Sequence, residues 1–214
     1  MDSNKLGNLL NEYKLTQLKE TSIDPDPFGQ FDKWFDEVLK CEITYPNAMV
    51  LATTDNSLVP SVRTVLLKSI DEQGAVFFTN YESRKGKELN INPRASLLFF
   101  WKELERQVRI EGTIEKIGRE KSEEYFHSRP RESQLSAWVS HQSEVIPGRK
   151  FLEEKFEQLK NKFGDDEIPL PDFWGGYRVV PDYFEFWQGR ENRLHDRICY
   201  KKENAGWKIF RLSP

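Results

Sequence analysis

The first strong pattern in the chain is helical. Apolar side chains recur three and four positions apart between residues 28 and 40, at Phe28, Phe31, Trp34, Phe35, Val38 and Leu39. Positions with this spacing share one face of a helix, so the pattern predicts a helix with a buried face. We interpret that face as core or interface, with no chemistry attached. Residues 1–27 before it are mostly polar and predict an arm that ends in a proline-containing turn.

The rest of the chain predicts mainly strands. Short apolar or alternating runs bounded by turn-forming residues predict strands at 48–54, 61–70, 75–80, 95–101, 107–116, 176–180, 183–188, 197–202 and 207–212. The last two are expected to form a closing hairpin. Helices are expected from an N-cap at Ser83 to about residue 90, over 119–129 and over 149–163. Pro130 predicts a break after the second of these.

Strands linked by short turns, with helices inserted between groups, predict a mainly β fold with helices, of the α+β class, built on an antiparallel barrel. The strand–helix alternation of a doubly wound sheet is missing. GxGxxG and GxxxxGK[ST] are missing as well, which argues against a dinucleotide fold. We expect a polar arm over 1–27 and a single domain over 28–214.

Composition narrows the class of protein. Hydrophobic residues make up 37% and charged residues 31% of the 214 positions, which is typical of a water-soluble globular domain. The formal net charge of -3 gives no reason to expect nucleic acid as a partner. Apolar runs fall far short of the ~20 residues that span a membrane, and the N-terminus is too polar for a secretory signal. We therefore expect a cytoplasmic protein whose two cysteines are reduced thiols, and no metal site.

Two basic segments are candidates for anion binding. Arg84 and Lys85 follow Ser83 at a predicted helix start, where positive side chains oppose the helix dipole unless an anion binds there. Two solvated surface charges are the alternative. Arg63 and Lys68 bracket an apolar strand segment, and an ideal strand puts them on opposite faces. They would serve two anions, or one anion if a bulge intervenes; the alternative is two strand-end charges that reach water.

A third candidate is a phosphate cradle. Tyr125 and Arg129 are four residues apart and share a helix face, and Ser133 beyond Pro130 can fold back toward them. An ordinary helix surface is equally compatible with that spacing.

A fourth candidate lies near the C-terminus. If residues 193–197 are extended, then Arg193, His195 and Arg197 project to one side, after an aromatic segment that contains Trp187. A histidine among arginines is well placed to titrate near neutrality. The alternative is an edge strand whose arginines pair with Asp182, Glu185 or Asp196. Gln107, Gln142 and Ser143 add uncharged hydrogen-bonding groups.

Taken together, these segments resemble the pyridoxine (pyridoxamine) 5′-phosphate oxidase family, from about residue 28 to the C-terminus. The matching motifs occur in the order and spacing of the family. They are RTVLLK (63–68), FFTNYESRKGKEL (77–89), ERQVRIEG (105–112), YFHSRPRESQL (125–135), SHQSEVIPGR (140–149), FWGGYRV (173–179), EFWQG (185–189) and NRLHDR (192–197).

The resemblance implies an FMN-binding split β-barrel and a homodimer with sites at the subunit interface. It also implies oxidation of pyridoxine or pyridoxamine 5′-phosphate by oxygen to pyridoxal 5′-phosphate, with release of hydrogen peroxide. The FMN-binding residues it implies are Arg63, Thr64, Val65, Leu66, Leu67, Lys68, Phe78, Thr79, Arg84, Lys85, Gln107, Gln142, Ser143, Trp187 and Arg197. The substrate-binding residues it implies are Lys68, Tyr125, Arg129, Ser133, Arg193, Leu194 and His195, of which Arg193 and His195 face the pyridine ring as catalytic residues.

Two positions depart from the family pattern. Position 78, often tyrosine in the family, is Phe78 here, and this change leaves only backbone or ring contacts. Family members also carry an arginine near a tyrosine in the arm, whereas this chain has Leu10, Asn11, Glu12 and Tyr13 followed by Lys14. A lid role of the arm is therefore not carried over.

Two other functions fit the same residues. A flavin reductase of the same fold would use NAD(P)H and would have no need of the Tyr125, Arg129 and Ser133 cradle. A non-catalytic carrier of FMN or pyridoxal phosphate would bind its ligand without turnover.

Overall fold

The computed structural model describes residues 12–204 and 206–214. Leu10 and Asn11 of the arm lie outside the described residues. The chain divides into two compact units. Of the described residues, unit 1 contains 12–49, 97–111, 182–204 and 206–214, and unit 2 contains 50–96 and 112–181. The single domain expected from residue 28 onward stays a prediction.

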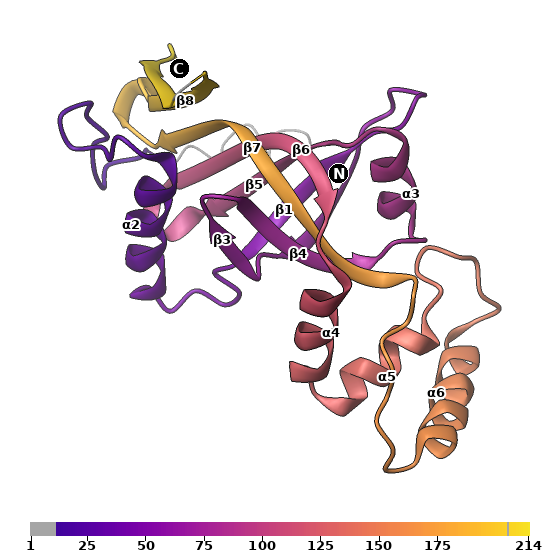
Figure 1. The fold of residues 1–214 in the computed structure, drawn as a ribbon. Helices are drawn as coiled ribbons and strands as arrows, with labels where there is room; N and C mark the ends of the chain where they lie inside the picture. The colour runs from indigo at the N-terminus through magenta and orange to yellow at the C-terminus, as the bar shows by residue number, and fades with distance from the viewer. Residues whose placement is uncertain (1–11, 205) are drawn as a thin grey trace, which may run out of the picture. The chain divides into compact units, whose positions relative to one another are not determined.

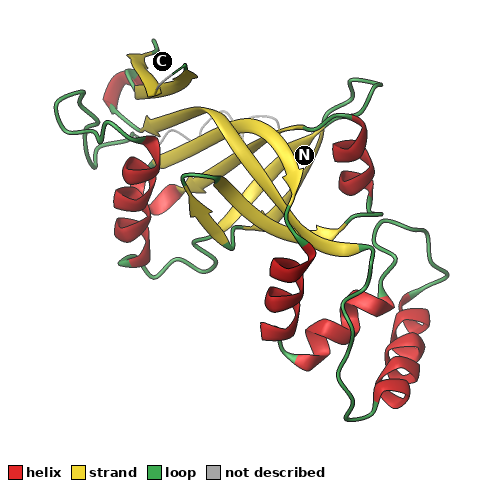
Figure 2. Ribbon diagram, viewed as in Figure 1, coloured by secondary structure: helices red, strands yellow, loops and turns green. Residues whose placement is uncertain are grey.

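The strands of the described residues belong to one sheet with the order β2-β1-β5-β6-β7-β4-β3, and β8 pairs with β7 and β9 (Figures 1 and 2). Their bounds are β1 Ala48–Thr53, β2 Ser61–Leu66, β3 Ser69–Asp71, β4 Gly74–Asn80, β5 Arg94–Trp101, β6 Arg106–Lys116, β7 Trp174–Gln188, β8 Asp196–Glu203 and β9 Gly206–Arg211. The pairs β3–β4, β4–β7, β7–β8 and β8–β9 are antiparallel. The α+β class and the antiparallel sheet are confirmed, as is the closing hairpin.

Unit 1 is built on helix α2, Pro27–Leu39. Asp26 caps this helix by accepting a hydrogen bond from the Phe28 amide, and proline occupies the first helical position. Most of the predicted apolar face is buried: Phe31 contacts Phe99 edge-on, with ring centroids 5.2 Å apart, and Trp34 contacts Phe186 in the same way at 5.3 Å. The interpretation of this face as core is confirmed except at Phe35, which is half-buried, and Leu39, which is exposed.

Unit 2 carries the remaining α-helices of the described chain. They are α3 Arg84–Ile91, α4 Arg119–Ser128, α5 Arg131–Val139 and α6 Arg149–Phe163. The last three share an apolar cluster around buried Phe126, Leu135 and Trp174. Helix α5 was not predicted, because its face is short and mostly polar; Pro130 ends α4 as expected, but a new helix begins at the next residue. No helix among the described residues has the length and hydropathy of a membrane span.

Two strand predictions were wrong. The single strand expected over 61–70 is interrupted at Leu67 and Lys68, where the chain leaves β2 and enters β3. The two strands expected over 176–188 are one continuous strand, β7, with Pro181 inside it. The proline is tolerated because it lies between two ladders: Val179 still pairs with Ala75 of β4, and Tyr183 already pairs with Lys201 of β8.

Candidate active site

A pocket of about 920 Å3 in unit 2 collects most of the predicted site residues. Five cationic side chains belong to its lining among the described residues, and no aspartate or glutamate does: Arg63, Lys68, Arg84, Lys85 and Arg129. Serines, Thr64, Thr79 and Gln142 add neutral hydrogen-bonding groups, and Phe78, Tyr125 and Trp174 add aromatic rings. Cations without a carboxylate in the lining fit an anionic ligand, and the rings fit a flat one.

The break in the predicted strand explains how Arg63 and Lys68 reach the same pocket. Arg63 belongs to β2, whereas the Lys68 amide donates to the Val76 carbonyl of β4 at 2.8 Å. The chain therefore turns between the two cations, and both line the pocket. The two cations therefore do not lie on opposite faces of one strand, and the alternative of two unrelated strand-end charges is not found.

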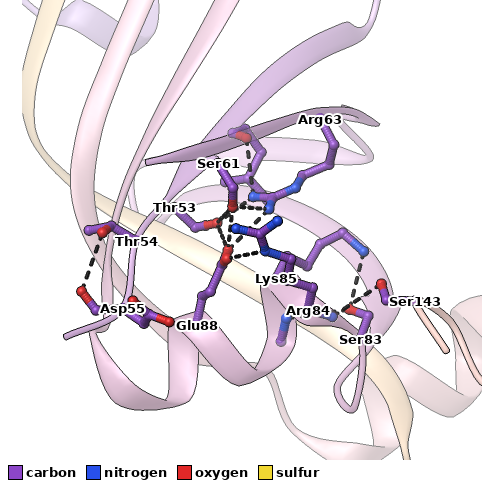
Figure 3. A network of polar contacts seen from close by, with 12 residues as sticks. Thr53, Thr54, Asp55, Ser61, Arg63, Ser83, Arg84, Lys85, Glu88 and Ser143 are labelled. Atoms are coloured by element: carbon purple, nitrogen blue, oxygen red, sulfur yellow. Dashed lines mark hydrogen bonds and ion pairs between the residues drawn. The ribbon is translucent and has the colours of Figure 1, made fainter. Parts of the chain in front are cut away.

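Glu88 of α3 connects two of these cations (Figure 3). Its carboxylate accepts from Arg84 Nε at 2.8 Å, from Arg63 Nη2 at 3.1 Å and from Ser61 Oγ at 2.6 Å. Thr53 Oγ1 donates to the same carboxylate, and Arg63 also donates to Thr53 and Ser61. Burial by itself would raise the pKa of Glu88, but these four hydrogen bonds outweigh it and lower the pKa to about 2.

Sequence reasoning missed Glu88 and its partners Thr53 and Ser61. One signal was present: Arg84 and Glu88 are four residues apart on a predicted helix, a spacing at which side chains pair. The approach of β1 and β2 to this helix depends on tertiary structure, so Thr53 and Ser61 carried no signal of their own.

Lys85 is a buried cation at the predicted helix start. Its Nζ donates to Gln142 Oε1 at 2.6 Å, to Thr79 Oγ1 at 3.0 Å and to the N-cap Ser83 Oγ at 3.2 Å. Burial, and next the positive charge of Arg63, lower the pKa of Lys85 to about 8, although Glu88 acts in the opposite direction. A bound phosphate would stabilise the charged ammonium.

Ser143 and the predicted N-cap complete this part of the pocket. The Arg84 amide donates to Ser143 Oγ at 3.2 Å, and Ser83 Oγ accepts from the Gly86 amide at 3.3 Å. Gly86 is required at this position because a Cβ would collide with the Tyr81 carbonyl oxygen. The predicted N-cap is confirmed, and both Arg84 and Lys85 line the pocket. Lys85 is buried, whereas the Arg84 side chain is exposed to solvent as well.

The predicted phosphate cradle is also brought together. Tyr125, Arg129 and Ser133 line the pocket, because the chain bends at Pro130 between α4 and α5. The Arg129 guanidinium lies 4.8 Å from the Trp174 ring, and its Nη1 is buried without a hydrogen-bond partner among the described residues. Burial lowers the pKa of Arg129, although Tyr125 opposes this. An unpartnered buried N–H in a cationic pocket is expected where an anion binds.

Aromatic rings form one side of the cradle. The Tyr125 ring stacks on Phe78 with centroids 4.0 Å apart, and Lys68 Nζ lies 5.5 Å from the Tyr125 centroid. Thr64, Val65 and Leu66, which the resemblance implied for FMN binding, line the pocket too. Leu67 does not: it is a buried core residue, and its proposed contact with FMN stays a prediction.

The remaining predicted residues lie in unit 1: Gln107, Trp187, Arg193, Leu194, His195 and Arg197. The condition under which Arg193, His195 and Arg197 would share one side, an extended segment over 193–197, is met only from Asp196 onward. Asn192 and Arg193 have φ values of 56° and 62° within a 3-10 turn over Glu191–Arg193, and β8 begins only at Asp196. Arg193 and Leu194 are exposed, and His195 and Gln107 are partly buried.

Arg197 is held by a buried carboxylate. Its Nε donates to Glu185 Oε1 at 2.7 Å, and Arg109 Nη2 donates to Glu185 Oε2 at 2.7 Å. The hydrogen bond to Glu185 raises the pKa of Arg197. Arg197 thus pairs with Glu185, as the alternative of a salt-bridged strand predicted. Its contact with a ligand stays a prediction.

The described part of the arm packs on the same unit. The Tyr13 ring contacts both Trp187 and His195 edge-on, with centroid distances of 5.5 Å in each case. The Lys14 and Leu15 amides donate to Glu105 Oε2, and the Leu18 amide donates to Asp196. Tyr13 therefore covers two predicted ligand-binding residues, although the family's arginine is missing.

An antiparallel sheet with inserted helices and a pocket lined by cations and aromatic rings fits the class of proteins that bind phosphorylated ring compounds. The family model described as pyridoxamine 5′-phosphate oxidase matches residues 35–163. A second one, described as the pyridoxine 5′-phosphate oxidase C-terminal dimerisation region, matches residues 174–214. The chain belongs to the pyridoxamine 5′-phosphate oxidase family, which confirms the resemblance seen in the sequence.

Individual relatives cover nearly the whole chain. A protein from Nostoc sp. named pyridoxine/pyridoxamine 5′-phosphate oxidase is 52% identical over 210 residues, which cover 98% of both chains. One of the same name from Crocosphaera subtropica is 55% identical over 212 residues, covering 98% of this chain and 99% of its own.

Solved structures show the same fold. PhzG from Burkholderia lata, in complex with tetrahydrophenazine-1-carboxylic acid, has a TM-score of 0.88 at 27% identity and covers 95% of this chain and 100% of its own. A pyridoxamine 5′-phosphate oxidase-related, FMN-binding protein from Nostoc punctiforme has a TM-score of 0.69 at 14% identity, covering 92% of this chain and 99% of its own.

Replacing Glu88 with glutamine should lower the free energy of unfolding at pH 7 by about 2–4 kcal/mol, because a buried carboxylate that accepts from two arginines is lost. The Glu88 pKa is depressed in the folded state, so its stabilisation is present above pH 4.5 and is lost as the pH falls toward 2. Urea unfolding at several pH values measures both effects. The gap between wild type and Glu88→Gln should narrow below pH 4.5, whereas the exposed control Glu153→Gln should stay within about 0.5 kcal/mol. A constant gap would contradict the network.

Affinity for FMN, the expected ligand, should fall as the pH rises above 8. Bound phosphate favours charged Lys85, whose pKa is about 8 in the structure, so binding takes up a proton above that pH. The loss should approach tenfold per pH unit, measured by quenching of flavin fluorescence between pH 6.5 and 9.5. Lys85→Arg keeps its charge throughout this range and should flatten the profile; an unchanged slope in that variant would assign the titration to another group.

Proposed function

We propose that this protein oxidises pyridoxine 5′-phosphate or pyridoxamine 5′-phosphate to pyridoxal 5′-phosphate, with FMN as cofactor and oxygen as acceptor, releasing hydrogen peroxide. The observation that carries the proposal is one pocket with two groups of cations and no carboxylate in its described lining. Relatives more than 50% identical over nearly the full chain bear the name of this activity.

The first group fits the phosphate of FMN. Arg63 and Arg84 are connected through Glu88. Lys85 donates to Thr79 and Gln142, and the Arg84 amide donates to Ser143, so neutral groups surround these cations. When bound there, FMN would accept two electrons from the substrate and pass them to oxygen. The protein's part is to hold the phosphate and to orient the ring.

The second group fits the phosphate of the substrate. Lys68, Tyr125, Arg129 and Ser133 supply two cations and two hydroxyls, and Arg129 still has a buried N–H to donate. A phosphate fixed at this end of the substrate turns remote binding energy into alignment of the reacting carbon.

The residues of unit 1 would act on the pyridine ring. Arg193, Leu194 and His195 lie on the exposed or partly buried segment before β8, where Arg193 would hold the ring and His195 would hydrogen-bond to it. Trp187, Arg197 and Gln107 would contact FMN. We propose that these sites form in a homodimer; the match of residues 174–214 to a dimerisation region supports it.

The direct test is to purify the protein, record its visible spectrum and follow pyridoxal phosphate formation in air without added nicotinamide. We expect a flavin spectrum, and pyridoxal phosphate and peroxide in equal amounts. Peroxide that appears only with NAD(P)H would favour a flavin reductase, and flavin binding without turnover would favour a carrier.

Arg129→Gln should raise KM for the phosphorylated substrate about 10- to 100-fold, since one charge-assisted contact is worth about 1.5–3 kcal/mol. The unphosphorylated vitamer should be turned over at an unchanged kcat/KM. Arg149→Gln, a matched change at an exposed arginine paired with Glu153, should leave both substrates unaffected. An equal loss with both substrates would move Arg129 away from the phosphate.

A further inference from the structure

The hydrogen bonds around His195 specify which of its nitrogens carries the proton. The backbone N–H of Arg190 donates to His195 Nδ1 at 3.1 Å. An amide N–H can donate only to an unprotonated ring nitrogen, so Nδ1 holds a lone pair. A neutral imidazole with a lone pair on Nδ1 has its proton on Nε2.

The neighbouring carboxylate offers no counter-charge for a protonated ring. Asp196 accepts from Arg211 Nη1 at 2.7 Å, from the Leu18 amide at 3.0 Å and from Arg190 Nη1 at 3.2 Å. Two arginines and a backbone amide thus occupy this carboxylate, although it is adjacent in sequence to His195. An imidazolium beside it would gain little from a charge that is already neutralised.

His195 packs against two aromatic rings and lies near a like charge. The ring lies 4.7 Å from Trp187 and 5.5 Å from Tyr13, measured between centroids. Arg193 adds a like charge two residues away. Burial, and next Arg193, lower the pKa of His195, while Asp196 opposes them only in part.

We propose that His195 works as a neutral imidazole that donates a hydrogen bond from Nε2, and that the backbone N–H of Arg190 selects this tautomer. The Arg190 guanidinium meanwhile donates to Asp196. His195 then orients the substrate and does not take up the proton released in the oxidation. That Nε2 faces the substrate rests on the function proposed above; the tautomer itself does not.

The tautomer is measured by nitrogen NMR of the FMN-loaded protein labelled with 15N-histidine, with the His195 signal assigned by its loss in His195→Gln. We expect a protonated Nε2 and an unprotonated Nδ1 at pH 7 and 8. A protonated Nδ1, or an imidazolium at pH 7, would overturn the proposal. This spectrum needs no turnover, so its outcome is separate from whether pyridoxal phosphate forms.

The role of His195 as a hydrogen-bond donor is tested with two variants, His195→Gln and His195→Asn. A flavin spectrum of each variant checks that its cofactor content is unchanged. The glutamine amide can reach the place of Nε2, whereas the asparagine amide reaches only that of Nδ1. We expect His195→Gln to stay within about threefold of the wild-type kcat/KM and His195→Asn to lose roughly tenfold, as for one neutral hydrogen bond. Equal losses of about 100-fold or more in both, with disappearance of an ionisation between pH 6 and 8, would show proton transfer instead.

Discussion

The pocket depends on the buried carboxylate of Glu88. Cations that face one cavity repel each other by a few kcal/mol per close pair at the effective dielectric of a protein surface. Glu88 offsets part of this repulsion from beneath, where it binds Arg63 and Arg84 and is only 4% exposed. The lining itself therefore stays free of negative charge, and the two guanidiniums keep fixed orientations. Arginines that are already ordered lose less entropy when a phosphate binds.

Unit 1 also contains a buried glutamate that accepts hydrogen bonds from two arginines. Glu185 is buried on β7 and accepts from Arg109 and Arg197, while Tyr183 donates to Cys199 beside them. The β7–β8 register pairs Arg197 with Trp187 and Glu185 with Cys199. Glu185 and Arg197 therefore lie on neighbouring strands, two positions apart in the pairing. In both units a buried glutamate determines where a predicted ligand-binding arginine points.

The features that could be predicted from the sequence are those that depend only on residues close by in the chain. The α2 face, the Ser83 cap, the α4 break and the closing hairpin depend on neighbours within a few residues, and all were predicted. The features that were missed depend on partners far along the chain. The break at Lys68 follows from pairing with β4, the continuity of β7 follows from its change of partner, and Glu88 gains its role from β1 and β2. The residue types at 192 and 193 do not by themselves predict the positive φ angles of Asn192 and Arg193. An extended segment therefore remained open from the sequence.

Charge balance argues for two phosphorylated ligands rather than one. The five cations of the lining and the buried Glu88 leave about four net positive charges around the pocket. A phosphate monoester carries about 1.5 to 2 negative charges near neutral pH. A single phosphate would leave roughly two positive charges without a counter-charge, among them Arg129, whose Nη1 has no partner in the described chain. Two phosphates would come close to neutrality, and the division of the cations between the Glu88 network and the Tyr125–Trp174 rings gives each phosphate its own set of donors.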